Sequence, residues 1–178
     1  MSVAANLRRA LGEFKSEGGS FAVEAALLAP VLVFFVMLTI NFGVAYNTKL
    51  RLVTAAGAGM AYAQKNGASV TTAEDVASLV ASITKVVQNS ADFSVPPKVA
   101  VSFNNASDGS AADGYYCING APAVWSRADG ASSQCGNNVT AGKFVTLTLS
   151  TDVNSIFPTD GIVGAFIPLQ ETIVARVQ

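Results

Sequence analysis

The side chains that could do chemistry are few in this chain of 178 residues. Histidine is absent, which excludes catalytic triads that need imidazole, histidine proton shuttles and most zinc sites. Cys117 and Cys135 are the two cysteines, too few for a thiolate metal cluster. Lys and Arg number 11 and Asp and Glu 12, so no basic excess is available to neutralise phosphates. The composition therefore predicts a protein that is not an enzyme, needs no metal or cofactor and does not bind nucleic acid.

One carboxylate, Glu24, stands inside an apolar segment. Besides Glu24, the segment Phe21–Tyr46 contains only the polar residues Thr39 and Asn41. A carboxylate within a bilayer costs about 2.5–3.5 kcal/mol or more, so an acidic residue there indicates a function. The alternative is that Glu24 reaches the water interface and merely flanks the apolar segment.

The elements that must position Glu24 begin with this apolar segment. Charged residues make up 13% of the chain and hydrophobic residues 51%, whereas a soluble domain carries roughly 25% charge. As a helix, Phe21–Tyr46 is about 39 Å long, enough to cross a hydrocarbon core of about 30 Å. A buried core helix and a cleaved secretory signal are the alternatives, but a signal has an apolar region of only about 7–15 residues. We expect a retained transmembrane helix.

The cysteine pair bears on which side of the membrane the rest of the chain lies. A bond between Cys117 and Cys135 would restrain a stretch rich in Gly, Ser, Ala and Asn, and such bonds persist outside the cytoplasm. Two buried free thiols are the alternative. The basic residues of Met1–Gly19 favour a cytoplasmic N-terminus, although Lys49 and Arg51 lie beyond the other end. We expect the bond, and with it an extracytoplasmic C-terminal domain.

Two helical patterns follow the apolar segment. The first helix is expected to continue to about Gln64 and to end at Asn66-Gly67, with one face formed by Leu50, Val53, Gly57 and Met60. The segment Thr71–Asp75 has a capping-box pattern. It predicts a second, amphipathic helix over residues 72–90, which should pack its apolar stripe on a sheet.

Alternating apolar residues predict strands over Lys98–Phe103, Phe144–Ser150 and Thr172–Gln178. We expect an antiparallel sheet with one covered face, and so an α+β domain. The long intervening stretch Asn104–Gly142 contains aromatic residues that could form short strands. The apolar stretch Ile156–Leu169 is interrupted by Pro and Gly; it is either a loop crossing the core or a contact with another subunit.

The acidic residues of the long loop are weak candidates for a metal site. Asp108, Asp113 and Asp129 lie among Asn and Ser residues, but without the spacing of an EF-hand. We interpret them as part of a solvated loop.

A family resemblance is carried by the string GGSFAVEAALLAPVL, residues 18–32, and by Asn41-Phe42-Gly43. Both resemble the TadE-like family, the minor pilins (pseudopilins) of the Tad, or type IVb, pilus. The resemblance implies that a prepilin peptidase cuts between Gly19 and Ser20. It divides the chain into a prepilin leader (1–19), a transmembrane helix (20–46) and an extracytoplasmic, pilin-like α+β head (47–178).

The resemblance also implies a structural role in initiating, priming or capping a pilus that supports adhesion. In such assembly Glu24 would pair with the Ser20 ammonium of a neighbouring subunit. Pro30 would mark a kink or simply be a tolerated transmembrane proline. The expected partners are other pilin subunits, the prepilin peptidase, the inner-membrane assembly platform and lipid. The chain would lie in the bacterial inner membrane with a periplasmic head before assembly, and on the pilus or cell surface afterwards. The alternative is an uncleaved single-pass subunit of an envelope or secretion complex.

Overall fold

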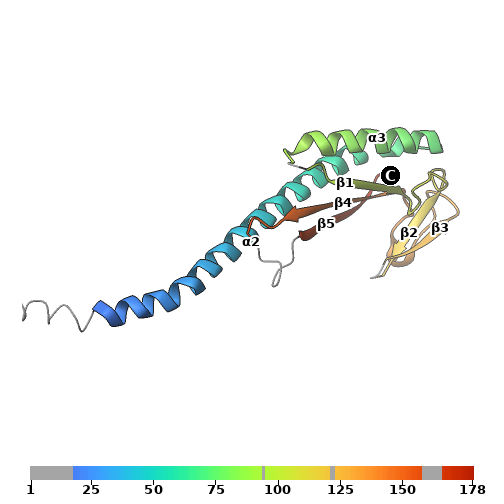
Figure 1. The fold of residues 1–178 in the computed structure, drawn as a ribbon. Coiled ribbons are helices and arrows are strands. Elements are labelled where there is room, and N and C mark those ends of the chain that lie inside the picture. Colours follow the sequence, from blue (N-terminus) through green and yellow to red (C-terminus); the bar gives the residue numbers. More distant parts are fainter. Residues whose placement is uncertain (1–17, 94, 121–122, 158–165) are drawn as a thin grey trace, which may run out of the picture.

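The computed structural model describes residues 18–93, 95–120, 123–157 and 166–178. A long helix, α2 (Gly18–Asn66), runs from an isolated stem into a head formed by the rest of the chain (Figure 1). A short 3₁₀ turn, η1 (Gly67–Ser69), connects it to a second helix, α3 (Ala73–Ser90). Strands and a second 3₁₀ turn, η2 (Gly136–Asn138), complete the head, which confirms the predicted α+β class.

The head contains two antiparallel sheets. The larger has the order β1-β4-β5, with β1 (Lys98–Phe103), β4 (Phe144–Asn154) and β5 (Phe166–Arg176). The smaller is a hairpin of β2 (Tyr115–Asn119) and β3 (Val124–Ala128), at the end of the head farthest from the stem (Figure 1). The long loop therefore does contain short strands, as its aromatic residues suggested.

The core lies where the second half of α2 crosses the three-stranded sheet and α3. The predicted continuation of α2 is confirmed, because the helix ends at Asn66. Of the predicted face, Met60 is buried, whereas Leu50, Val53 and Gly57 are exposed. The residues of α2 that are buried in the core are Leu52, Ala55, Ala56, Gly59, Met60 and Ala63. Most of them are small, because they let the helix approach the sheet and α3 closely.

Helix α3 begins as the sequence predicted. The Asp75 backbone N–H donates to Thr72 Oγ1 at 3.1 Å, and the Thr72 backbone N–H donates to Asp75 Oδ2 at 3.0 Å, which completes a capping box. Backbone N–H donors from Thr71 and Thr72 lower the pKa of the Asp75 carboxyl below its ordinary value.

Helix α3 was predicted to pack on a sheet, and this prediction was only partly right. Its buried stripe is Val76, Leu79, Ile83 and Val87. This stripe packs mainly on α2, and α3 has few contacts with the sheet, at strand β1. The second half of α2 thus contacts both α3 and the sheet, and it supplies much of the surface that α3 covers (Figure 1).

A buried lysine joins the end of the sheet to the start of α3. Lys143 is 3% exposed, and its ammonium donates to the Val70 carbonyl at 2.5 Å and lies 5.6 Å from the centre of the Tyr115 ring. Burial lowers the pKa of this ammonium. No sequence pattern singled out Lys143, because its partners are distant along the chain.

Three strand boundaries differ from the prediction, including the end of β5, which lies at Arg176 and not at Gln178. Strand β4 continues to Asn154, and β5 begins at Phe166, inside the predicted loop Ile156–Leu169. Leu169 packs against the core as a core-crossing segment would, whereas Ile156 and Phe166 are exposed. Residues 158–165 of that loop lie outside the described residues.

Gly59→Val is expected to lower the free energy of unfolding by about 1–3 kcal/mol through overpacking. A Cβ atom at Gly59 would lie 2.7 Å from Val87 Cγ2 and 3.0 Å from Leu147 Cδ2, so two core side chains would have to move. Gly57→Val is the matched control, because no atom lies within 4 Å of its added Cβ and the helix propensity change is the same. Thermal and denaturant unfolding of the full chain in micelles, followed by circular dichroism, compares the two. Equal midpoints would show that α2 does not pack as described.

Candidate assembly site on the apolar helix

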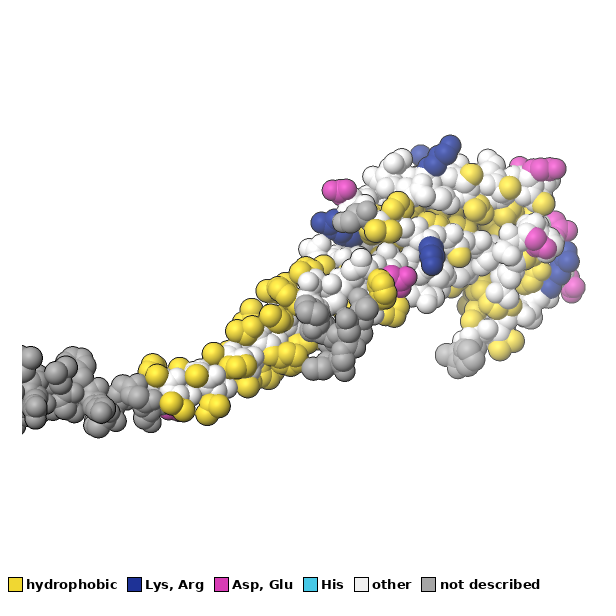
Figure 2. Space-filling model, viewed as in Figure 1, with side chains coloured by type: hydrophobic (Ala, Val, Ile, Leu, Met, Phe, Trp, Pro, Cys, Tyr) yellow, Lys and Arg dark blue, Asp and Glu magenta, His cyan; other side chains and the backbone are white. Residues whose placement is uncertain are grey.

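The stem of α2 is a helix with its apolar side chains facing outward. From Phe21 to Ile40 no residue is buried in the protein, and large hydrophobic side chains such as Phe21 and Leu27 are more than 70% exposed. Figure 2 shows hydrophobic side chains along the stem up to the head. In its described part, the chain has one helix whose length and composition suffice to cross a membrane. Water is a poor solvent for such a surface, so the stem is suited to lipid or to other helices.

Glu24 lies on this stem, near its beginning, and its side chain is exposed. Two ion pairs occur among the described residues, Lys49–Glu171 at 2.5 Å and Arg127–Asp113 at 3.3 Å, and both are in the head. Within the described part of the chain, Glu24 therefore has no cationic partner. In lipid, a cation from outside the described residues would stabilise its charge.

Gly19 and Ser20, the predicted cleavage pair, lie in the first turn of α2 as the structure describes it. Glu24 follows little more than one helical turn later. The structure thus places the predicted cleavage position and Glu24 at the same end of the apolar stem. Cleavage itself is not tested by this arrangement and stays a prediction.

Pro30 lies inside α2 without ending it. Proline lacks the N–H that would bond the Ala26 carbonyl, so one rung of the helix is missing there. Figure 1 shows the stem curving in its blue part while remaining one helix.

Asn41 is a buried polar residue at the end of the stem, and its contacts were not predicted from the sequence. It is 3% exposed, and its amide donates to Ser155 Oγ at 2.8 Å. Its Oδ1 accepts from the backbone N–H of Ile156 at 3.0 Å and of Phe157 at 3.4 Å. Asn41 therefore ties the end of the apolar stem to the chain just after β4. The available signal was an amide in an otherwise apolar helix.

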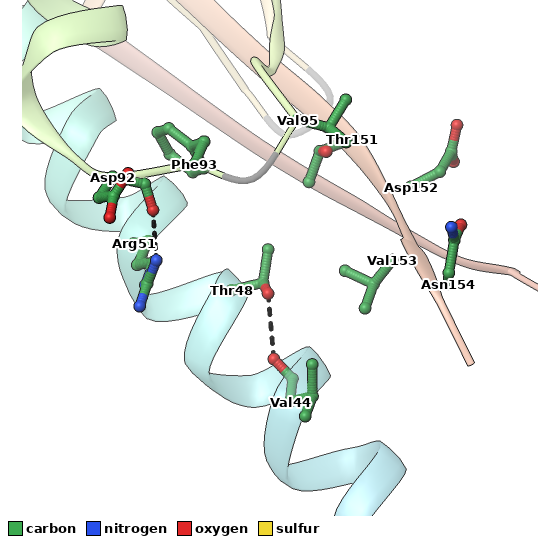
Figure 3. Close-up of a pocket in the computed structure, with 10 residues that line it drawn as sticks. All are labelled: Val44, Thr48, Arg51, Asp92, Phe93, Val95, Thr151, Asp152, Val153 and Asn154. Carbon is green, nitrogen blue, oxygen red and sulfur yellow. Dashed lines mark hydrogen bonds between the residues drawn. The ribbon is translucent and has the colours of Figure 1, made fainter. Parts of the chain in front are cut away.

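A groove lies beside α2 just past this point, with a volume of about 250 Å³. Figure 3 shows side chains from α2, from the segment after α3 and from the end of β4 around it. The Arg51 guanidinium donates to the Asp92 carbonyl, and Thr48 Oγ1 donates to the Val44 carbonyl at 3.0 Å. The Arg51 bond joins α2 to the segment after α3, and the Thr48 bond lies within α2.

The disulfide prediction is confirmed, because Cys117 and Cys135 are bonded, with their Cα atoms 5.6 Å apart. Cys117 is in β2 and Cys135 precedes η2, so the bond attaches the hairpin to the segment that returns toward β4.

Two of the acidic residues of the long loop, Asp108 and Asp113, have partners nearby. Asp108 Oδ1 accepts from the Ser110 backbone N–H at 3.0 Å, and the Ser110 hydroxyl and N–H lower the pKa of this carboxyl. Asp113 pairs with Arg127. Among the described residues, no three His, Cys, Asp or Glu side chains gather as metal ligands would.

Comparison with known proteins finds a family match in the N-terminal part of the chain, which includes the stem. Residues 19–61 match a family model described as TadE-like protein. This match confirms the resemblance over the apolar stem and over the part of α2 up to residue 61, most of which packs in the head. No curated protein and no solved structure matches the chain.

Proposed function

We propose, from the TadE-like character of residues 19–61, that this Tad pilus-associated, membrane-anchored protein is a minor pilin. The single observation that carries the proposal is that the match begins at Gly19 and extends through Glu24 along an outward-facing apolar helix. The stem would be held in the inner membrane before assembly and among the helices of other subunits afterwards. The protein would contribute structure, and its role would be to initiate, prime or cap the pilus.

The leader carries the first step of this function. A prepilin peptidase would hydrolyse the Gly19–Ser20 bond and release residues 1–19. The new Ser20 ammonium would lie close to lipid, as the Glu24 carboxylate does. Pairing of this ammonium with Glu24 of a neighbouring subunit would satisfy both charges, and an unpaired charge at either position would be costly. Ordered addition of subunits follows from that requirement.

The disulfide bond of the head supports an extracytoplasmic location for this domain. The Cys117–Cys135 bond is of the kind that persists in an oxidising compartment. We therefore place the head in the periplasm before assembly and on the pilus or cell surface afterwards, where it would support adhesion. The chain would interact with other pilins and with the assembly platform, and it would act as a substrate of the peptidase rather than as an enzyme.

The native chain is expected to begin at Ser20 in cells that contain a prepilin peptidase. Intact mass and N-terminal sequencing of the protein from membranes test this directly. Gly19→Val should leave the leader attached, because a side chain is placed on the residue before the cut bond. Gly18→Val, one position earlier, is the matched control and should still be cut. A wild-type chain that keeps its leader beside an active peptidase would instead support a static single-pass subunit of an envelope complex.

A further inference from the structure

The structure marks where the stem ends and the head begins. Between Phe21 and Ile40 no α2 residue is buried, and Asn41 is the first that is. At about 1.5 Å per residue, Phe21–Ile40 is about 30 Å long, which equals the thickness of a bilayer hydrocarbon core. In a membrane spanned by this stem, Asn41 therefore lies at the outer edge of the hydrocarbon.

Asn41 fixes a second part of the chain at the same level. Hydrogen bonds between Asn41 and Ser155, Ile156 and Phe157, of 2.8, 3.0 and 3.4 Å, hold the chain just after β4 against the helix. Asn154, the last residue of β4, is paired with Phe166, the first residue of β5. Figure 1 shows this end of the sheet beside the middle of α2 and pointing back along the stem.

Two apolar side chains at this end of the sheet are exposed. Ile156 is 57% exposed and Phe166 60% exposed; we call these two residues the tip patch. Phe42, on the helix at the same level, is 58% exposed. Exposed apolar side chains that gather at one level favour a partner over water.

We propose that the tip patch contacts the bilayer, so that the end of the β4–β5 pair forms a second membrane attachment beside α2. The partner is lipid at the boundary between headgroups and acyl chains, where aromatic and aliphatic side chains are stabilised. The level set by Asn41 favours lipid over a protein partner, because the tip patch lies where the bilayer surface must be. The inference rests on the membrane-spanning stem of the proposed function but not on pilus assembly.

The attachment would constrain the head. A single helix leaving a bilayer can tilt in any direction, whereas contact at a second point restricts the tilt about one axis. The head of an unassembled subunit would therefore keep one side toward the membrane. Extraction into a pilus would release the tip patch from lipid together with the stem.

Fluorescence quenching by lipid measures this contact in the full chain. The protein has one tryptophan, Trp125, in β3 at the far end of the head. In a Trp125→Phe background, tryptophan is placed at Ile156 or at Phe166, and each chain is inserted singly in phosphatidylcholine nanodiscs. Acyl chains brominated near the headgroup are expected to reduce the emission of both variants by about half, since interfacial residues lie at that depth.

Two further chains make the result decisive. The wild-type chain, whose tryptophan is Trp125, should keep its emission in the same discs. Leu32→Trp in the Trp125→Phe background places tryptophan in the middle of the stem, and its emission should be quenched by bromine near the bilayer centre. Unquenched tryptophan at Ile156 and Phe166 with a quenched Leu32→Trp would overturn the second attachment and leave the anchored pilin intact. An unquenched Leu32→Trp would overturn the spanning stem itself, and both proposals with it.

Discussion

Replacing Glu24 with alanine is expected to abolish incorporation of the chain into a pilus while leaving membrane insertion and folding of the head intact. Removal of a carboxylate from an apolar helix eases insertion, because a charge within the bilayer costs a few kcal/mol. Glu24 lies on the stem, away from the core residues of the head. Assembly would lose the partner of a neighbour's Ser20 ammonium. Breaking a buried pair from one side costs about 3–5 kcal/mol, which is enough to prevent a weak association.

Co-purification with the other pilus subunits, together with pilus counts, measures this loss. Glu24→Gln should be intermediate, since an amide keeps hydrogen bonding but not the charge. Thr39→Val is a matched control on the same stem: the Thr39 hydroxyl donates to the Phe35 carbonyl at 2.8 Å, within its own helix. This control should assemble normally. Normal assembly of Glu24→Ala would mean that Glu24 only flanks the membrane.

Loss of the Cys117–Cys135 bond is the second large effect that we expect. In the loop-entropy model, a bond that closes a loop of this length contributes about 3 kcal/mol. The effect should be local, because neither cysteine belongs to the core cluster of α2, α3 and the three-stranded sheet. The hairpin meets the rest of the head through Tyr116–Gly142 backbone hydrogen bonds of 2.8 and 3.0 Å and through the edge-to-face pair of Trp125 and Phe144.

Two probes separate the hairpin from the core. In a Cys117→Ala/Cys135→Ala chain, Trp125 emission should change at a lower denaturant concentration than circular dichroism, which follows mainly the helices. Reduction of the wild-type disulfide should have the same effect. A single transition at the wild-type midpoint would show that the bond does not stabilise the hairpin.

The elements that the sequence predicted well are those defined by local chemistry. Strand β1 has the predicted bounds, because Val99, Val101 and Phe103 alternate without a break after two prolines. Helix α3 begins beside its predicted Thr72 cap, since the capping box is formed by residues three positions apart. The disulfide was predictable because only one pairing of two cysteines exists.

The elements that were missed depend on tertiary contacts. Of the α2 face predicted from Leu50, Val53, Gly57 and Met60, only Met60 is buried. Close helix packing places Ala55, Ala56 and Gly59 in the core. The start of β5 was missed because Pro168 interrupts the pattern. The strand accepts it since β5 is an edge strand, where one side needs no donor.

In the candidate site, too, the residues predicted from the sequence are those whose role depends on near neighbours in the chain. Gly19, Ser20 and Glu24 were found from a short motif, because leader cleavage and charge pairing depend on residues close together in the sequence. The anchoring role of Asn41 could not be found in this way, because its partner Ser155 is 114 positions away.

The continuity of α2 has a mechanical consequence. Because the stem and the core-forming half are one helix of 49 residues, about 74 Å long, the head cannot swivel independently of the stem. Each residue of an α-helix turns the chain by about 100° about the helix axis. The direction in which Glu24 faces about that axis therefore also fixes the direction in which the head faces. A pilus that sets the rotation of each stem would thereby present every head in a defined direction, and torque applied at the membrane would reach the outer surface through a single rod.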